Sequence, residues 1–270
     1  MLESKITLFQ IEDLAHINHL QPADWSDIKV NMLDYCVQSF CTPIKFVEHG
    51  AILGIGSLIL HQNSAWLAHI IVAEDSRGMG IGARIVKHLL QLANEKGIYS
   101  VSLIATELGK PLYEKCGFRS VENYQFSKKG SRFASESLSP FLRPAEDKHV
   151  QQILALDSQC TGESRSTFIS NYLSLAVVYE RNDQMEGYYL PHLKEGPIYA
   201  ITPEAGLALL ALKCNNTDLI AIPQSNITGL EYLKECGFEM QDKIAIRMVF
   251  GRDILWQPQN IYSRIGGNYG

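Results

Sequence analysis

Hydrophobic positions recur along the chain with two periods, and the order of these periods is that of a mixed α/β protein. Ala65–Ala73 is a dense apolar run rich in branched residues, which predicts a central strand. Before it, Ile44–Glu48 and Ala51–His61 predict a hairpin with a His-Gly turn. After it, apolar residues return at helical spacing up to Gly97, a residue type that commonly ends helices.

The other elements predicted in the first half are shorter. We expect strands over Lys5–Phe9, Tyr99–Ala105 and Phe118–Ser127, a helical stretch over Asp13–Gln38 that is broken near Pro22, and a short helix over Pro111–Cys116.

The second half repeats this order after a linker over Lys128–Pro140, which is rich in Ser, Lys and Gly. The last helix of each half ends in Cys-Gly-Phe. Thr106 and Gly109 precede the first of these endings, and Asn226 and Gly229 precede the second at the same distances in the sequence. A duplicated domain is the simplest explanation. We expect strands over Phe141–Ala145, Ala176–Glu180, Gly187–Leu190, Pro197–Ile201, Leu219–Ile222 and Phe238–Phe250, and helices over Glu146–Gln159, Ser166–Leu175, Glu204–Lys213 and Asn226–Cys236.

Composition excludes several classes of protein. The chain has 270 residues, 46% of them hydrophobic and 20% charged, and a formal net charge of -5, which argues against a nucleic-acid partner. The longest apolar stretch, Ala51–Leu60, is too short to span a bilayer, so no membrane partner is expected. The six cysteines lack the spacing of a zinc site, and no metal is expected. Met1–Gln10 lacks the apolar run of a signal peptide, so we expect a cytoplasmic protein with reduced cysteines.

A glycine-rich turn joins the central strand to the following helix. It reads Arg77-Gly78-Met79-Gly80-Ile81-Gly82. The first backbone N–H groups of a helix have no intrahelical partner, and together with the helix dipole they bind phosphate oxygens. Glycine lets the backbone approach a pyrophosphate closely, although a turn that only packs a helix on a sheet has the same composition. The spacing does not fit a GxGxxG dinucleotide turn, and no Lys-Ser/Thr pair follows as in a P-loop.

Two motifs resemble those of the GNAT N-acetyltransferase superfamily. Arg77-x-x-Gly80-x-Gly82 resembles its R/Q-x-x-G-x-G/A signature, and Leu112-Tyr113-Glu114-Lys115-Cys116-Gly117-Phe118 resembles its LYxxxGF motif. They stand in the family order and cover most of residues 5–127, and residues 141–250 resemble a degenerate second copy. The resemblance implies two tandem acyl-CoA N-acyltransferase domains of mixed α/β (α+β) fold. Residues 1–130 would be catalytic, and residues 140–270 would complete the acceptor site.

The resemblance also implies roles for individual residues, with acetyl-CoA as co-substrate. The turn would hold the pyrophosphate, and the backbone N–H of Val72 would stabilise the oxyanion of the tetrahedral intermediate. Tyr113 would protonate the leaving thiolate, the alternative being a buried aromatic that anchors its helix. For Arg77, the alternative to a role in cofactor binding is that it is a solvated cation of the loop. Thr106 stands where the family often has Asn. The expected cofactor-binding residues are Ile71, Val72, Arg77, Gly78, Met79, Gly80, Ile81, Gly82, Ala83 and Thr106, and the expected catalytic residue is Tyr113.

The base that deprotonates the amine is left open by the sequence. His69 lies three residues before Val72, and strand alternation puts these side chains on opposite faces unless a bulge intervenes. We therefore interpret His69 as a core or surface histidine. Glu48, Glu74 and Asp75 are alternatives that are expected to be solvated, and a chain of waters is another.

The second half is not expected to be catalytic. After its apolar strand, Pro203 lacks an N–H and Glu204 would repel a pyrophosphate, while Leu233 stands at the position of Tyr113. Asp157 and Arg165 are candidates to bind an amine and a carboxylate of the acceptor, against the alternative of helix capping and a surface salt bridge.

The sequence thus favours an N-acetyltransferase that transfers the acetyl group of acetyl-CoA to an amine by direct attack. The acceptor is expected to be a small molecule or a peptide, and the protein a monomer or homodimer. One alternative is a non-catalytic protein that senses acyl-CoA, and another is an enzyme that takes a larger acyl donor.

Overall fold

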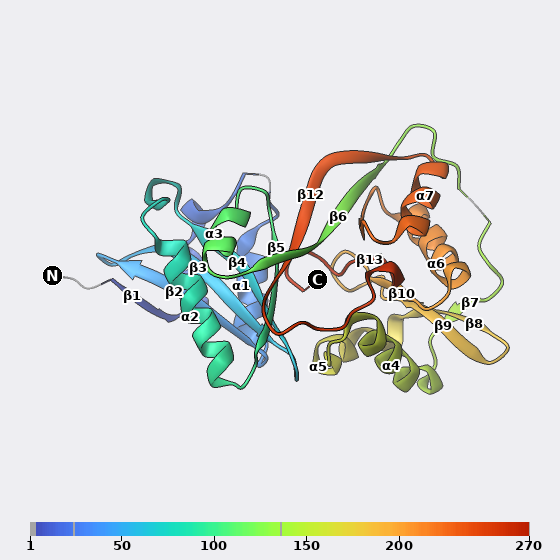
Figure 1. The fold of residues 1–270 in the computed structure, drawn as a ribbon, viewed down its shortest axis with the longest axis horizontal. Coiled ribbons are helices and arrows are strands. Elements are labelled where there is room, and N and C mark those ends of the chain that lie inside the picture. Colours follow the sequence, from blue (N-terminus) through green and yellow to red (C-terminus); the bar gives the residue numbers. More distant parts are fainter. Residues whose placement is uncertain (1–3, 24, 136, 270) are drawn as a thin grey trace. The chain divides into compact units, whose positions relative to one another are not determined.

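The computed structural model describes residues 4–269 except residues 24 and 136. The chain forms two compact units, which are coloured mostly blue to green and green to red in Figure 1. Unit 1 holds the described residues up to Arg119 together with Met248–Arg252 and Tyr269. Unit 2 holds Ser120–Arg247 and Asp253–Asn268. Both units combine helices with a mixed or antiparallel sheet, so the predicted fold class is confirmed.

In unit 1, five strands lie side by side in chain order. The first four are antiparallel neighbours, and the last two are parallel. The strands are β1 (Lys5–Leu8), β2 (Cys41–Glu48), β3 (Ala51–Leu60), β4 (Ala65–Val72) and β5 (Ser100–Ala105). The predicted hairpin is confirmed, with left-handed His49 and Gly50 at its turn.

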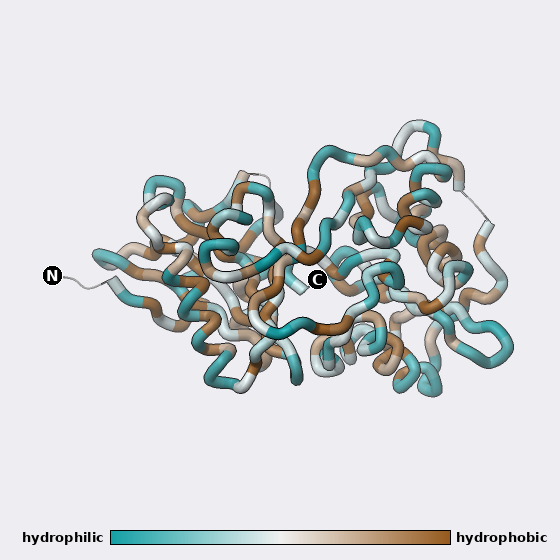
Figure 2. Tube along the Cα trace, viewed as in Figure 1, coloured by the Kyte–Doolittle hydropathy of each residue, from teal (hydrophilic) through white to brown (hydrophobic). Residues whose placement is uncertain are grey.

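Helix α2 (Ile81–Glu95) packs on this sheet through glycines of β3. A Cβ added at Gly56 would lie 2.8 Å from Ile85 Cγ2, and one at Gly54 would lie 2.9 Å from Ile85 Cδ1. The missing side chains therefore let the helix approach the strand closely. In Figure 2 the tube of α2 alternates between hydrophobic and hydrophilic segments, as an amphipathic helix requires.

The last strand of each half of the sequence joins the sheet of the other half. Strand β6 (Arg119–Lys129) pairs with β11 (Leu219–Pro223), from Lys128 opposite Leu219 to Tyr124 opposite Pro223. Strand β12 (Phe238–Gly251) begins in unit 2, and its last residues lie beside β5 in unit 1. The Phe118 and Phe250 rings are 5.6 Å apart in unit 1. Each unit therefore contains segments from both halves of the sequence.

Unit 2 is built around a second, five-stranded antiparallel sheet. Its order is β13 (Ile261–Ser263), β10 (Ile198–Ala200), β9 (Gln184–Tyr189), β8 (Val177–Arg181) and β7 (Leu142–Pro144). The turn between β8 and β9 is hydrophilic in Figure 2. The helices of this unit are α4 (Val150–Thr161), α5 (Ser166–Ile169), α6 (Pro203–Asn216) and α7 (Ile227–Glu235).

Strand β13 lies between β10 and β11, and the sequence gave no sign of it. It pairs antiparallel with β10, and on its other side the Arg264 N–H donates to the Ala221 carbonyl of β11 at 3.2 Å. Tyr262 is only 3% exposed, and its ring lies against α6. A Cβ added at Gly206 would be 2.2 Å from two atoms of this ring, so only glycine fits there.

The structure corrects three of the predicted elements. Asp13–Gln38 forms two 3₁₀ turns, Ile11–His16 and Asn18–Leu20, before helix α1 (Ile28–Val37). The short 3₁₀ turns precede Pro22, whose ring cannot continue a helix. Ser166–Leu175 is helical only to Ile169 and continues as a 3₁₀ turn, and β6 extends two residues into the expected linker. Position 136 of that linker and the first three residues lie outside the described residues.

We expect Gly206→Ala to destabilise the protein by about 1–3 kcal/mol, because the added methyl group overlaps the Tyr262 ring. Urea denaturation followed by fluorescence measures the change. Gly267→Ala is the control, since a Cβ there meets no atom within 4 Å. Equal stability of the two variants would show that β13 is not held against α6.

Candidate active site

A gap opens between β4 and β5 in unit 1. The two parallel strands pair only at Ala65 with Val101 and at Trp66 with Ser102. Strand β4 then runs on to Val72 and β5 to Ala105 without further pairing. Backbone groups along the gap are therefore available to a bound molecule. At the end of β4, the side chain of Ile71 is buried and that of Val72 is half-buried.

The glycine-rich turn lies directly after β4 and starts α2. Gly78 and Gly80 have φ of 77° and 80°, a region that favours glycine, and a Cβ added to either would meet no atom within 4 Å. Gly80 is the N-cap of α2, and no described side chain caps this helix start. The N–H groups of Ile81, Gly82 and Ala83 thus belong to an uncapped first turn, which suits an anion.

The remaining residues of the turn differ in exposure. Arg77 is largely exposed, and its Nε donates to the Val72 carbonyl at 3.4 Å while Nη1 is 3.8 Å from Glu74 Oε1. Met79 is 66% exposed. Ile81 is buried, and a Cβ added at Gly82 would be 3.0 Å from Leu112 of helix α3 (Lys110–Lys115). Arg77 therefore ties the turn to the end of β4.

Tyr113 lies on helix α3 (Lys110–Lys115) and is 9% exposed. Its ring packs edge-on against Phe118 at 6.0 Å between centroids. Burial raises the pKa of the Tyr113 phenol above its ordinary value, and the nearby Cys116 thiol adds to the effect. The hydroxyl is therefore fully protonated at neutral pH.

Thr106 caps the turn that leads into α3, because its Oγ1 accepts a hydrogen bond from the Gly109 N–H at 3.1 Å. In unit 2 the Asn226 side chain accepts from the Gly229 N–H at 2.8 Å in the same way. The repeat seen in the sequence is thus a repeated cap. Asn226 also donates to the Ile261 carbonyl of β13 at 3.0 Å, so one of its groups is already used.

Strand β4 contains a β-bulge, a feature whose presence the sequence did not decide. Ile55 pairs with Ile71 and Ser57 with Ala68, so His69 and Ile70 both lie opposite Gly56. His69 has a left-handed φ of 50°, which is unusual for a residue with a side chain. Its Nδ1 is 2.8 Å from the Tyr35 hydroxyl of α1, and its ring meets Tyr35 and Trp25 edge-on.

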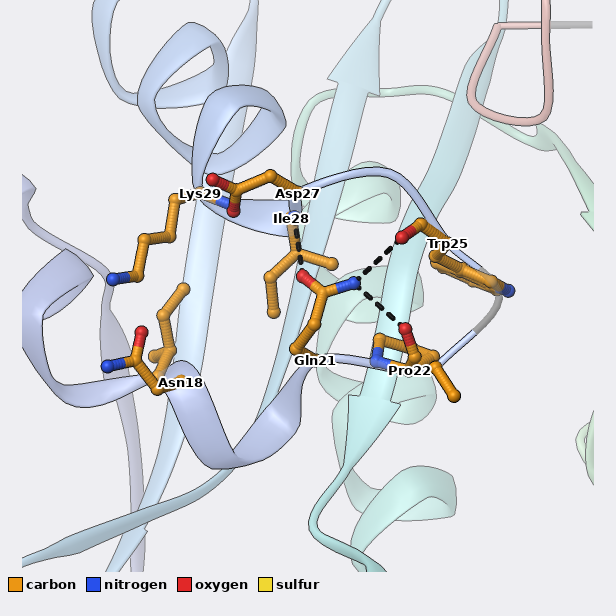
Figure 3. Close-up of a pocket in the computed structure, with 9 residues that line it drawn as sticks. Asn18, Gln21, Pro22, Trp25, Asp27, Ile28 and Lys29 are labelled. Carbon is orange, nitrogen blue, oxygen red and sulfur yellow. Dashed lines mark hydrogen bonds between the residues drawn. The ribbon is translucent and has the colours of Figure 1, made fainter.

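The loop before α1 forms a shallow pocket and carries Trp25. As Figure 3 shows, the Gln21 amide lies inside the loop. Its Nε2 donates to the carbonyls of Pro22 and Trp25 at 2.9 and 3.0 Å, and its Oε1 accepts from the Ile28 N–H at 2.9 Å. Asp27 caps α1 by accepting from the Lys29 N–H at 2.9 Å. One glutamine therefore fixes the backbone that places Trp25 beside His69.

The corresponding region of unit 2 is closed. Helix α6 begins with Pro203, and Thr202 caps it by accepting from the Ala205 N–H at 3.4 Å. The gap between β10 and β11 holds β13, and Ser263 of that strand accepts from the buried Lys213 at 2.7 Å. The start of α6 thus has a proline without an N–H and an Ala205 N–H that is already capped.

Asp157 and Arg165 form a buried ion pair in unit 2. They are 2% and 3% exposed, so the expected surface salt bridge is wrong. The Arg165 Nη2 and Nε donate to the Asp157 carboxylate at 2.8 and 2.9 Å, and Tyr188 donates to the same carboxylate. The sequence alone could not show this burial, which depends on α4 packing against β9 and β10.

Comparison with known proteins agrees with this architecture. Residues 37–136 and residues 153–263 each match a family model described as an acetyltransferase (GNAT) domain. The chain belongs to the GNAT acetyltransferase family, as a tandem of two such domains. Its resemblance to that family in the sequence is thereby confirmed.

Relatives and solved structures fit this assignment. The chain is 25% identical over 213 residues to the uncharacterised N-acetyltransferase YitH of Bacillus subtilis, covering 72% of this chain and 73% of that one. It is 34% identical over 131 residues to a glucosamine 6-phosphate N-acetyltransferase of Trypanosoma brucei brucei, covering 45% and 88%. The fold matches that of a candidate acetyltransferase from Pyrococcus horikoshii, with a TM-score of 0.80, 18% identity and coverage of 99% and 96%.

Sequence reasoning missed Tyr35, Trp25 and β13. Tyr35 and Trp25 stand in a stretch with weak helical periodicity, and only folding brings them to His69. Among the residues that the structure describes, no three metal-ligating side chains gather, and no helix has the length and apolar character to cross a membrane.

We expect Gly80→Glu to weaken acetyl-CoA binding by at least about tenfold, or about 1.4 kcal/mol. The new carboxylate lies at the helix start, where it would repel the pyrophosphate and occupy its donors. Calorimetry measures the affinity. Gly97→Glu is the matched control, because Gly97 follows the end of the same helix with φ of 75° and equally open space around its Cβ. Equal losses in both variants would contradict a phosphate site at the turn.

Proposed function

We propose that this protein is an acetyl-CoA-dependent N-acetyltransferase that acetylates an amine of a small molecule or peptide. The observation that carries the proposal is the uncapped, glycine-rich start of α2 directly beside the gap between β4 and β5. A phosphate site and an open strand edge on neighbouring elements suit a ligand with a pyrophosphate and a long amide-containing arm. Membership of the GNAT family supports the same reading.

The proposed mechanism uses unit 1 alone. The turn Arg77–Ala83 holds the pyrophosphate, and Ile71 and Val72 bind the arm of the cofactor through their backbone. Thr106 contacts that arm from the turn after β5. The Val72 N–H polarises the acetyl carbonyl and stabilises the oxyanion that forms when the amine attacks. Tyr113, which is protonated at neutral pH, donates its proton to the sulfur that leaves.

Unit 2 is proposed to be non-catalytic and to support the acceptor side. Its helix start is capped by Thr202, and β13 fills its gap. The chain should therefore bind one molecule of acetyl-CoA. A second candidate is a protein that senses acyl-CoA without turnover. Tyr113, a proton donor that such a sensor would not need, favours the enzyme.

We expect calorimetry to give one acetyl-CoA bound per chain, because only unit 1 keeps an open gap. In the Gly80→Glu variant, the fraction of chains that carry acetyl-CoA at the same concentrations should fall, because the affinity is at least about tenfold lower. Two molecules bound per chain would show that β13 does not close unit 2. No binding by folded wild-type protein would contradict the proposed function as a whole.

We expect Tyr113→Phe to lower turnover by about 10²–10⁴-fold while acetyl-CoA still binds, since the variant loses only the hydroxyl. Thiol release with an amine panel measures the rate. The panel begins with glucosamine 6-phosphate, because two relatives are named for acetylating it, one of them 41% identical over 77 residues. Tyr99→Phe is the control, as Tyr99 is 50% exposed before β5. Unchanged turnover in Tyr113→Phe would remove Tyr113 from the chemistry.

A further inference from the structure

We propose that the pocket before α1 recognises an oxyanion of the acceptor, so that the substrate is a small amine that also carries a phosphate or carboxylate group. Lys29, Asn18 and Trp25 are the residues assigned to this recognition. The assignment rests on the proposed function and names the substrate class of the same site. It is carried by hydrogen-bond donors of the pocket that have no partner among the residues that the structure describes.

The pocket has the size of a small-molecule site. Its volume is about 390 Å³, and it is lined by the turn Asn18–Leu20, the loop after it and the start of α1. Ile17 and Ile28, which are fully buried, form the apolar part of its lining. Pockets of about 300–1,000 Å³ with an apolar lining and a few polar groups bind small molecules. The volume therefore favours a compact acceptor over a long peptide.

One side of the pocket is attached to the strand beside the end of β4. In the turn Asn18–Leu20, His19 Nε2 is 2.8 Å from the Ile52 carbonyl oxygen of β3. The next residue of β3, Leu53, accepts from the Ala73 N–H that directly follows β4. The turn is thus tied to the part of the sheet where β4 ends and where the acetyl carbonyl is proposed to bind.

The other side of the pocket meets β4 itself. The Trp25 ring lies edge-on to the His69 ring, with 5.7 Å between centroids. The Val72 side chain points the opposite way, because a Cβ added at Gly82 of α2 would lie 3.7 Å from Val72 Cγ2. The pocket therefore lies on the face of the sheet that α2 does not cover. With acetyl-CoA held at the start of α2, an amine in the pocket approaches the acetyl group from the opposite face.

The hydrogen-bond acceptors of the pocket serve the protein backbone. Gln21 Oε1 accepts from the Ile28 N–H at 2.9 Å, while its Nε2 donates to carbonyls of the loop. Asp27 Oδ1 accepts from the Lys29 N–H at 2.9 Å and caps α1. The positive end of the helix dipole also offsets the charge of this carboxylate. Gln21 and Asp27 therefore hold the loop and the helix start.

The donors of the pocket remain available to a ligand. Across the described stretches 17–23 and 25–29, the side chains of Asn18, Trp25 and Lys29 form no hydrogen bond or ion pair. Lys29 is half-buried, so part of its charge is removed from water. An ammonium group in this position is stabilised by an anion. The pocket thus supplies the donors, and its ligand has to supply the acceptors.

The arrangement fits an oxyanion at one end of the acceptor and a ring or aliphatic part at the other. In Figure 3 the Lys29 ammonium and the Asn18 amide lie toward one end of the pocket, and the Trp25 ring lies toward the other. An ammonium and an amide NH₂ together bind phosphate or carboxylate oxygens. Trp25, 41% exposed, offers its ring for packing. An acceptor with only positive charge would be repelled by Lys29.

The first test detects the anion without any turnover. In the full chain labelled with nitrogen-15 lysine and loaded with coenzyme A, each lysine gives one backbone signal, and Lys29→Met identifies that of Lys29. We expect inorganic phosphate at millimolar concentration to shift the Lys29 signal in a saturable way, and Asn18→Leu to weaken this binding. The signal of Lys96, an exposed lysine at the end of α2, is the control in the same sample.

The second test compares acceptors in pairs that differ only in the oxyanion. Glucosamine 6-phosphate is paired with glucosamine, and β-alanine with its amide, so the pairs separate a phosphate from a carboxylate. We expect Lys29→Met to lower the ratio of kcat/KM within at least one pair by about tenfold or more, through KM, with kcat and acetyl-CoA affinity unchanged. Comparing variants cancels the intrinsic reactivity of each amine. Lys96→Met is the matched control, and the Lys29 N–H that caps α1 is kept in Lys29→Met.

The outcomes separate this proposal from the proposed function. A Lys29 signal that phosphate does not shift saturably would overturn the proposal, also where no member of either pair is acetylated. An enzyme that prefers the neutral member of both pairs, or ratios that Lys29→Met leaves unchanged, would overturn it as well. Failure of the folded wild type to bind acetyl-CoA would instead remove the proposed function, and the acceptor role of the pocket with it.

Discussion

The parting of β4 and β5 after two residue pairs is the constraint on which the rest of unit 1 depends. Strands that stop pairing leave backbone N–H and C=O groups that something else must satisfy, because an unpaired backbone group away from water costs free energy. In unit 1 these groups face an open gap beside an uncapped helix start. The gap, the turn and the bulge of β4 lie within a few residues of one another along the chain, and together they form the proposed site.

Unit 2 shows the same constraint met in a different way. Its strands β10 and β11 also part, and the chain fills the space with its own strand β13. Gly206 accommodates the Tyr262 ring, and Lys213 donates to Ser263 of that strand. At the start of α6, Pro203 lacks an N–H, and Thr202 caps the N–H of Ala205. One duplicated fold thus has an open copy and a copy closed by an internal strand.

The buried charges of unit 2 belong to its packing. Asp157 accepts from Arg165 and Tyr188, and Arg165 lies 5.1 Å from the centroid of the Tyr199 ring. The Asp157 oxygens are already bonded, which leaves little capacity for an amine. Removing one partner of such a pair leaves a buried charge unpaired, which is strongly destabilising. The pair therefore fixes how α4 lies on the sheet.

The sequence by itself determined the fold class, the family, the repeat and most of the strands, because period, turn residues and local motifs are properties of short segments. The sequence located the glycine-rich turn after β4, and two of its glycines have the positive φ that such a turn requires. It also identified Tyr113, whose role in catalysis stays a proposal. It also left open whether a bulge intervenes beside His69. A bulge is set by the register of two strands, which no single segment encodes.

Only the tertiary structure decided what meets across the chain. The contact of Tyr35 and Trp25 with His69 joins three segments, and the burial of Asp157 with Arg165 depends on helix packing. The placement of β6 beside β11, of β12 beside β5 and of β13 beside β10 depends on pairing between strands that are far apart in the sequence. Local periodicity predicts that a strand exists, whereas its neighbours are chosen by the packing of the whole unit.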